Sequence, residues 1–141
     1  MRYEFPVDLI READGRVSAV FDGLPGSTWG VDETDALARA TDALVTVLSA
    51  YVDDGHPVPA PGPIGGRPVV ALGALEASKL ALHDIMVSNG ISNVELARRM
   101  GTNEKAIRRL RDPLHRSHIG QVETALTMLG HRLSVEARAA A

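Results

Sequence analysis

The chain has 141 residues, of which 45% are hydrophobic and 23% charged, and its formal net charge is −3. This composition excludes a disordered or collagen-like chain. The absence of cysteine excludes a disulfide framework, a thiolate nucleophile and a cysteine-based zinc site. No apolar run approaches the ~18 residues of a membrane-spanning helix, and the first residues lack the apolar stretch of a signal peptide. We therefore predict a soluble, cytoplasmic protein.

The first part of the chain shows the two-residue period of β-strands. Three strands are expected, over residues 3–9, 17–21 and 27–30. Asp14 and Gly15 predict a hairpin turn between the first two strands, because both residue types tolerate positive φ. Residues 22–26 predict a loop. Trp29, in the third strand, is expected to fill the core or a domain interface, and it is also a candidate contact for a partner.

From residue 32 onward the period becomes helical. The apolar stripe consists of Leu37, Ala40, Leu44, Val47 or Leu48, and Tyr51. Asp32 is a suitable N-cap, and Gly55 ahead of Pro57 is a stop signal. Residues 68–72 can add a fourth strand, with Pro68 at an edge or at a strand start. The pattern predicts one small sheet covered by one helix, in the order β-β-β-α with an optional final strand.

A proline-rich segment separates two parts of opposite charge. Residues 56–66 contain four prolines and three glycines, which favour an extended connection. The first 66 residues hold four basic and eleven acidic side chains, a net charge of −7, and the remainder has a net charge of +4. This asymmetry suggests two modules, one for a basic protein surface and one for nucleic acid.

The second half of the chain predicts only helices. They are expected over residues 75–87, 93–100, 103–111 and 119–133. Ser92 and Glu95 have the spacing of a capping box, in which each side chain satisfies a free backbone N–H of the other residue. Thr102 is the expected cap of the third of these helices, and Asp112 with Pro113 ends it. These elements predict a compact helical bundle.

The helix pair over residues 93–112 has the spacing of a helix-turn-helix. Two helices that cross steeply need a small residue at their closest approach, which is Ala97. The turn needs a residue that accepts positive φ, which is Gly101, and Ile107 fills the wedge between the helices. An ordinary helical hairpin with glycine in its turn remains the alternative.

The outward residues of the second helix predict DNA binding. The N-terminal part of such a helix enters the major groove. Lys105 and Arg109 lie four residues apart and are suited to guanine, and Glu104 is suited to cytosine. Phosphate contacts are expected from Ser92, Arg108, Arg111, His115, Arg116 and Ser117. The predicted DNA-binding set is Ser92, Asn103, Glu104, Lys105, Arg108, Arg109, Arg111 and Arg116.

Charge and symmetry extend this prediction. Residues 98–116 hold seven basic and two acidic side chains. Useful affinity for DNA normally requires a two-fold dimer on half-sites about 34–36 Å apart. We therefore expect a homodimer or a higher even oligomer on double-stranded operator DNA, with the last helix or residues 133–135 as its contact. A merely solvated cationic face is the alternative.

Four motifs of the N-terminal part carry a resemblance to a known family: Asp22-Gly23-Leu24-Pro25-Gly26, Trp29-Gly30, Thr34-Asp35-Ala36-Leu37, and Asp54-Gly55 followed by Pro57 and Pro59. Through these motifs the chain resembles the HicB antitoxins of HicA–HicB toxin–antitoxin pairs. Residues 92–101 resemble the Xre/Cro-type DNA-binding domain of one branch of that family. Phe21 and Ser27 stand where the family often has proline and cysteine, so details of the toxin-contacting loop do not transfer.

The resemblance implies an α+β fold and a division of labour. A partial ribonuclease-H-like domain would bind and neutralise a HicA-like mRNA interferase, with contacts at Asp22, Leu24 and Trp29. The helix-turn-helix bundle would repress the shared operon. The predicted boundaries are 1–58 for the toxin-binding domain, with its final strand at 67–72, 59–73 for the linker, and 74–141 for the DNA-binding domain.

No catalysis, metal site or cofactor is expected. Ribonuclease-H chemistry requires several carboxylates around two metal ions, whereas Glu4, Asp8 and Asp22 are more simply solvating residues at strand edges. His115 and His118 are better suited to phosphate contact or helix capping than to metal binding. The alternative function is that of a stand-alone transcriptional regulator whose N-terminal domain senses a ligand or oligomerises.

Overall fold

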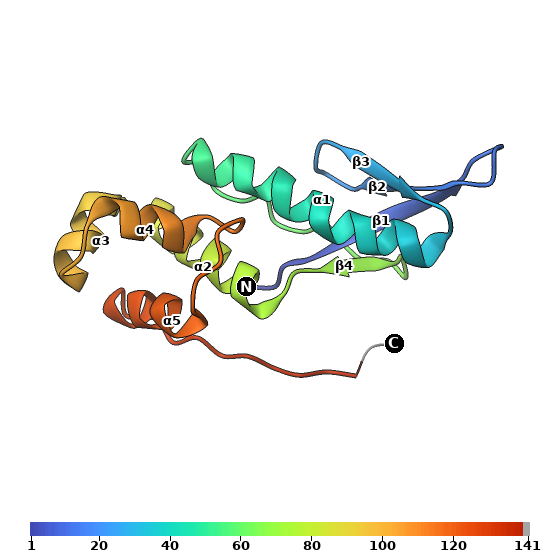
Figure 1. Cartoon of the computed structure of the whole chain (residues 1–141). Coiled ribbons are helices and arrows are strands. Elements are labelled where there is room, and N and C mark those ends of the chain that lie inside the picture. The colour runs from blue at the N-terminus through green and yellow to red at the C-terminus, as the bar shows by residue number, and fades with distance from the viewer. Residues whose placement is uncertain (140–141) are drawn as a thin grey trace.

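Figure 1 shows the computed structural model of the chain, which describes residues 1–139. Its elements in chain order are β1 (Glu4–Arg11), β2 (Val17–Phe21), β3 (Ser27–Gly30), α1 (Glu33–Asp53), β4 (Val69–Ala71), α2 (Ala74–Asn89), α3 (Asn93–Met100), α4 (Glu104–Arg111) and α5 (Ile119–Met128). The predicted α+β class is confirmed: a four-stranded antiparallel sheet with one helix is followed by four helices. None of the helices within residues 1–139 is long and apolar enough to cross a membrane.

The sheet is ordered β3-β2-β1-β4, and α1 covers one of its faces (Figure 1). Antiparallel pairing places Val7 opposite Phe21 and Leu9 opposite Ala19, so the predicted apolar faces coincide. The core between sheet and helix includes Phe5, Val7, Val17, Ala19, Phe21, Ala36, Ala40, Leu44 and Leu48. The two-residue period of the strands and the three- to four-residue period of α1 therefore meet in one cluster.

β3 passes very close to the start of α1. Asp32 caps this helix by accepting a hydrogen bond from the backbone N–H of Asp35 at 2.8 Å, as predicted. A Cβ atom on Gly30 would lie 2.3 Å from the backbone nitrogen of Ala36. A side chain at position 30 therefore has no space, and the strand and helix pack backbone against backbone.

The proline-rich segment forms no helix or strand before β4, but it is anchored to the sheet and to α2. Residues 69–71, part of the predicted linker, form β4 and pair with β1, so the optional fourth strand is present. Val58 is buried, and its backbone N–H donates to Asp84 at 2.9 Å. Arg67 pairs with Asp22 at 2.8 Å. Only residues 72–73 separate the sheet from the first helix of the bundle.

α2 contributes to two hydrophobic cores. It lies between the sheet unit, which comprises residues 1–72 with β1–β4 and α1, and the helices α3–α5 (Figure 1). Leu80 packs in the sheet core, whereas Leu82 packs in the helical core, and both side chains are fully buried. The helical core also contains Ile85, Met86, Leu96, Ala97, Ile107, Leu110, Val122, Ala125 and Leu126. One helix thus supplies apolar faces to both units.

The last helix ends earlier than its apolar stripe predicts. The expected helix reached Leu133, but α5 ends at Met128. Gly130 adopts φ 77°, and the backbone N–H of His131 donates to Leu126 at 2.9 Å, which are features of a glycine-based helix end. Leu133 lies beyond the helix and is partly buried against the helical core, whereas Ile119 at the start of the stripe is exposed. The apolar stripe therefore predicted most of the core contacts but not the end of the helix.

Candidate nucleic-acid interface

α3 and α4 have the conformations that a helix-turn-helix requires. Ala97 and Ile107 are buried, and Gly101 adopts the left-handed conformation at φ 67°. The side chain of Ser92 accepts the backbone N–H of Glu95 at 3.1 Å. The other half of the predicted capping box is wrong, because the Glu95 carboxylate binds Arg98 and Arg99 instead. Hydrogen bonds from these two guanidinium groups lower the pKa of Glu95.

The start of α4 is capped by Asn103, and the predicted cap at Thr102 is wrong. The Asn103 side-chain oxygen accepts the backbone N–H of Ala106 at 2.9 Å. Asn103, Glu104, Lys105, Arg108 and Arg109 are exposed, while Ile107 and Leu110 face the core. Arg108 pairs with Glu104 at 2.7 Å. The exposed face of α4 therefore combines cations, one carboxylate and an amide.

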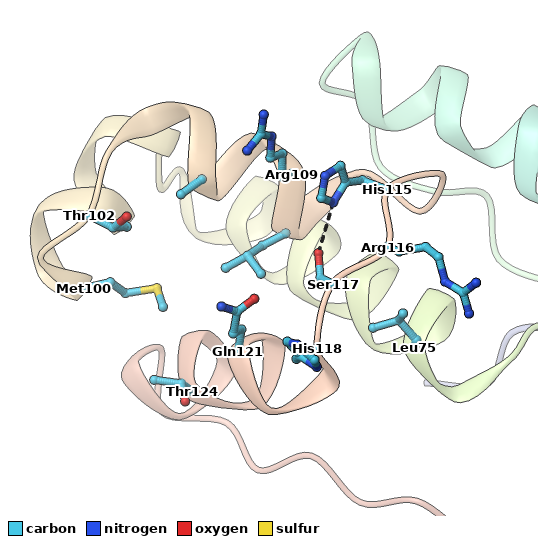
Figure 2. A pocket seen from close by; sticks show the side chains of 12 residues that line it. Leu75, Met100, Thr102, Arg109, His115, Arg116, Ser117, His118, Gln121 and Thr124 are labelled. Atoms are coloured by element: carbon cyan, nitrogen blue, oxygen red, sulfur yellow. Dashed lines mark hydrogen bonds between the residues drawn. The ribbon is translucent and has the colours of Figure 1, made fainter.

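A groove lies between α4, α5 and the loop that joins them, with a volume of about 750 Å³. Figure 2 shows Arg109 on the α4 side of this groove and Gln121 on the α5 side. His115 and Arg116, from the joining loop, are exposed and also line it. The basic side chains of the loop therefore lie beside the exposed face of α4.

Arg111 departs from the predicted phosphate contact. Its guanidinium donates to the Asn93 side-chain oxygen and to His83 Nδ1, both at 2.6 Å, and its Nε is buried without a partner among the described residues. Burial lowers the pKa of Arg111. The Arg111 side chain therefore connects α2, α3 and α4 and is not part of the exposed face of α4. Of the other predicted phosphate contacts, Ser92 and Arg116 are exposed.

His83, a partner of Arg111, has a defined tautomer. A guanidinium can only donate, so His83 Nδ1 must accept from Arg111, and Nε2 must carry the proton and donate to the backbone oxygen of His56 at 2.7 Å. Burial lowers the pKa of His83, and the charge of Arg111 lowers it further, although the bond to His56 opposes this change. The neighbouring Asp84 accepts a hydrogen bond from the hydroxyl of Tyr3 at 2.9 Å. Burial raises the pKa of Tyr3, and the charge and hydrogen bond of Asp84 raise it further.

Acidification is expected to destabilise the fold through His83. Its pKa in the folded chain lies below the ordinary value of 6.5, so between these two values the unfolded chain binds more protons. The free energy of unfolding therefore falls as the pH falls below about 6.5. Thermal melting at about pH 7.5 and about pH 5.5 tests this, with a lower Tm expected at the acidic pH.

The matched variants for this experiment are His83→Gln and His131→Gln, since His131 is exposed. His83→Gln should flatten the pH dependence of Tm, and His131→Gln should leave it unchanged. The same pH dependence in His83→Gln as in the unmodified chain would contradict the assignment.

The three predicted toxin contacts differ in accessibility. Asp22 is exposed and pairs with Arg67, whereas Leu24 is buried in the sheet core. Trp29 is 44% exposed, so its prediction as core filling is wrong. It pairs with Ser18 across β2 and β3 and lies opposite the covered face. The guanidinium of Arg16 stacks on its ring at 4.7 Å.

The structure also shows exposed apolar residues and a buried lysine that the sequence analysis did not predict. Exposed Ile10 and Val31 were not among the predicted contacts, and they add apolar surface in the sheet unit. Buried Lys79, also unpredicted, donates from α2 to the end of α4. Across residues 1–139 no group of three or more histidines and carboxylates is arranged to hold a metal ion.

Comparison with known proteins gives consistent relatives, although no family model matches the chain. The chain is 42% identical over 130 residues to Antitoxin HicB of Pseudomonas fluorescens, which covers 80% of this chain and 88% of that protein. It is 35% identical to Antitoxin HicB 2 of Photorhabdus laumondii, with 97% and 96% covered. It is 32% identical to Antitoxin HicB of Escherichia coli K12, with 96% and 98% covered.

Proposed function

Because the chain belongs to the HicB family of antitoxins, we propose that it neutralises a HicA-like toxin and represses its own operon by binding operator DNA. A protein of this family is a binding protein and not an enzyme. The division of labour follows the two units: the sheet unit binds the toxin, and α2–α5 bind DNA.

The observation that carries DNA binding is the exposed face of α4 on a helix-turn-helix. Lys105 and Arg109 are exposed while Ile107 between them is fully buried, so the helix presents one cationic face outward. Bidentate donors of this kind read guanine in the major groove. Arg116, in the joining loop, and Ser92, at the start of α3, are exposed on the flanking elements and are suited to phosphates.

Arg109→Ala is expected to weaken operator binding by about 1–3 kcal/mol and to relax base preference at one position. A gel-shift titration on the upstream region, with unrelated DNA as competitor, measures both effects. Arg11→Ala is the matched control, because it removes the same charge from an exposed position in β1. An equal loss on all sequences would assign Arg109 to the DNA backbone instead.

Toxin binding by the sheet unit is supported by its charge and by its exposed side chains. With Arg67 included through β4, residues 1–72 hold five basic and eleven acidic side chains, a net charge of −6. Acidic surfaces favour encounter with basic partners, and exposed Trp29 is of the residue type that dominates protein interfaces. Asp22 is a second accessible contact, while buried Leu24 supports the loop from within.

The test of toxin binding is co-expression with the product of the adjacent reading frame, which this proposal expects to be a short basic protein. A stable complex that loses RNA cleavage supports the proposal. Failure to bind that neighbour, together with retained DNA binding, would favour a stand-alone regulator.

Operator binding further implies a two-fold dimer. Exposed apolar side chains on α5 and beyond it provide candidate contacts: Ile119, Met128 and Val135. Light scattering of the chain alone measures its assembly, and a monomer at the concentrations that shift operator DNA would contradict this part of the proposal.

A further inference from the structure

Lys79 in α2 is a charged residue with no exposed surface. Its ammonium, which has three N–H groups, lies within hydrogen-bond distance of four oxygens: the backbone oxygens of Arg109 at 2.9 Å, Asp112 at 3.0 Å and His115 at 2.5 Å, and the hydroxyl of Ser117 at 2.8 Å. Within residues 1–139 no carboxylate oxygen lies within ion-pair distance of this ammonium. Lys79 is therefore satisfied by backbone oxygens at the end of α4 and in the loop that follows it, together with one hydroxyl of that loop.

Resting on the proposed DNA binding, we propose that Lys79 is a positioning residue for the DNA interface. Its ammonium fixes the end of α4 and the joining loop, residues 112–118, in one arrangement. Base-reading and phosphate-binding side chains then fit the same duplex together.

The local sequence explains why α4 needs this cation. In a continuing helix the carbonyl of Arg109 would accept the N–H four residues later, but residue 113 is proline and has none. The N–H of Asp112 is already bound to Arg108 at 3.1 Å. A cation at this end also interacts favourably with the partial negative charge of the helix C-terminus. Lys79 thus replaces the hydrogen bond that Pro113 removes.

The contacts of Lys79 span the elements that would meet DNA. Arg109 carries a candidate base-reading side chain, while His115 and Ser117 flank Arg116, a candidate phosphate contact. Ser117 was itself predicted to bind phosphate, but its hydroxyl accepts from Lys79. Because α2 is packed in both cores, it is a fixed support from which one ammonium sets the spacing between α4 and the loop.

Lys79→Met tests the proposal, since methionine keeps the apolar stem but has no ammonium. We expect the affinity for operator DNA to fall at least tenfold, the affinity for unrelated DNA to change little, and the slope of log affinity against log salt concentration to stay unchanged. Toxin binding should persist, which also shows that the sheet unit is folded. Ser78→Ala is the matched control, because Ser78 is buried in α2 but donates only within that helix, to Leu75.

Ser117→Ala is a second, milder variant that removes one acceptor of Lys79, and it decides the matter if Lys79→Met does not fold. It should lower the ratio of operator to unrelated-DNA affinity in the same direction, without a change in salt slope. Unchanged operator binding in Lys79→Met, or in Ser117→Ala if only that variant folds, would overturn this inference but leave the proposed DNA binding intact. So would an equal loss on all DNA with a slope reduced by about one, which marks a direct phosphate contact. An unmodified chain that binds no DNA would overturn the proposed function, and this inference with it.

Discussion

Gly30→Ala is expected to destabilise the sheet unit by about 3 kcal/mol, because the added methyl group has no space to occupy. Its Cβ would lie 2.3 Å from the nitrogen of Ala36 and 2.7 Å from the carbonyl carbon of Asp35. Both atoms are backbone atoms of the first turn of α1, so a side-chain rotation cannot relieve the contact. The strand or the helix must move, and that movement disrupts the core between them.

Urea unfolding followed by tryptophan fluorescence measures this effect directly, because the only tryptophan of the chain, Trp29, lies next to Gly30 in β3. Gly120→Ala is the matched control, since Gly120 lies in α5 with no atom near its added Cβ. It should leave stability unchanged or raise it by up to about 1 kcal/mol through helix propensity. An unchanged midpoint for Gly30→Ala would mean that β3 and α1 do not pack as described.

Periodicity predicted β1, β2 and α1 well because each of these elements buries mainly one face. The alternation over β1 and β2 and the stripe along α1 are local records of which side chains are buried. Trp29 shows the limit of this method. A short third strand offers too few residues to show which of its faces is covered, so an aromatic residue was assigned to the core although its register places it opposite.

The hydrogen-bond partners of the buried polar residues Lys79 and Arg111 could not be predicted from the local sequence pattern. Lys79 lies on the stripe formed by Leu75, Leu82 and Met86, and this position was the available signal of burial. What stabilises it is a group of carbonyls 30 or more residues away, which no helical period reports. Arg111 was likewise predicted to contact DNA. Its actual partners, Asn93 and His83, are distant in sequence, so no local pattern indicated them.

The proline-rich segment illustrates the same limit at the level of domains. Its composition predicts an extended connection, and the structure has no helix or strand over residues 56–64 and a turn at residues 65–66. Whether an extended segment is free or anchored depends on partners elsewhere in the chain. The backbone oxygen of His56 binds His83 of α2, 27 residues away, and the backbone N–H of Val58 binds Asp84, 26 residues away. The two units are therefore joined by hydrogen bonds as well as by the covalent connection.

Leu80→Ala and Leu82→Ala are each expected to lower the free energy of unfolding by about 2–5 kcal/mol, the usual range for a fully buried leucine. The two residues are two positions apart in α2, and neither side chain has any exposed surface. They face different cores, Leu80 that of the sheet and Leu82 that of the helical bundle. The same substitution in one helix should therefore have opposite functional consequences.

Leu82→Ala should reduce operator binding while toxin binding persists, and Leu80→Ala should do the reverse. The physical reason is that loosening one face of α2 leaves the contacts of its other face in place. In urea titrations, Leu82→Ala should lower the midpoint seen by far-ultraviolet circular dichroism more than the midpoint seen by tryptophan fluorescence, because the only tryptophan, Trp29, lies in β3 and the helical core contains none. For Leu80→Ala the order should be reversed. If both variants lower both midpoints equally, the bonds of His83 and Asp84 to the proline-rich segment couple the two cores into one cooperative unit, and toxin and DNA binding would then be lost together.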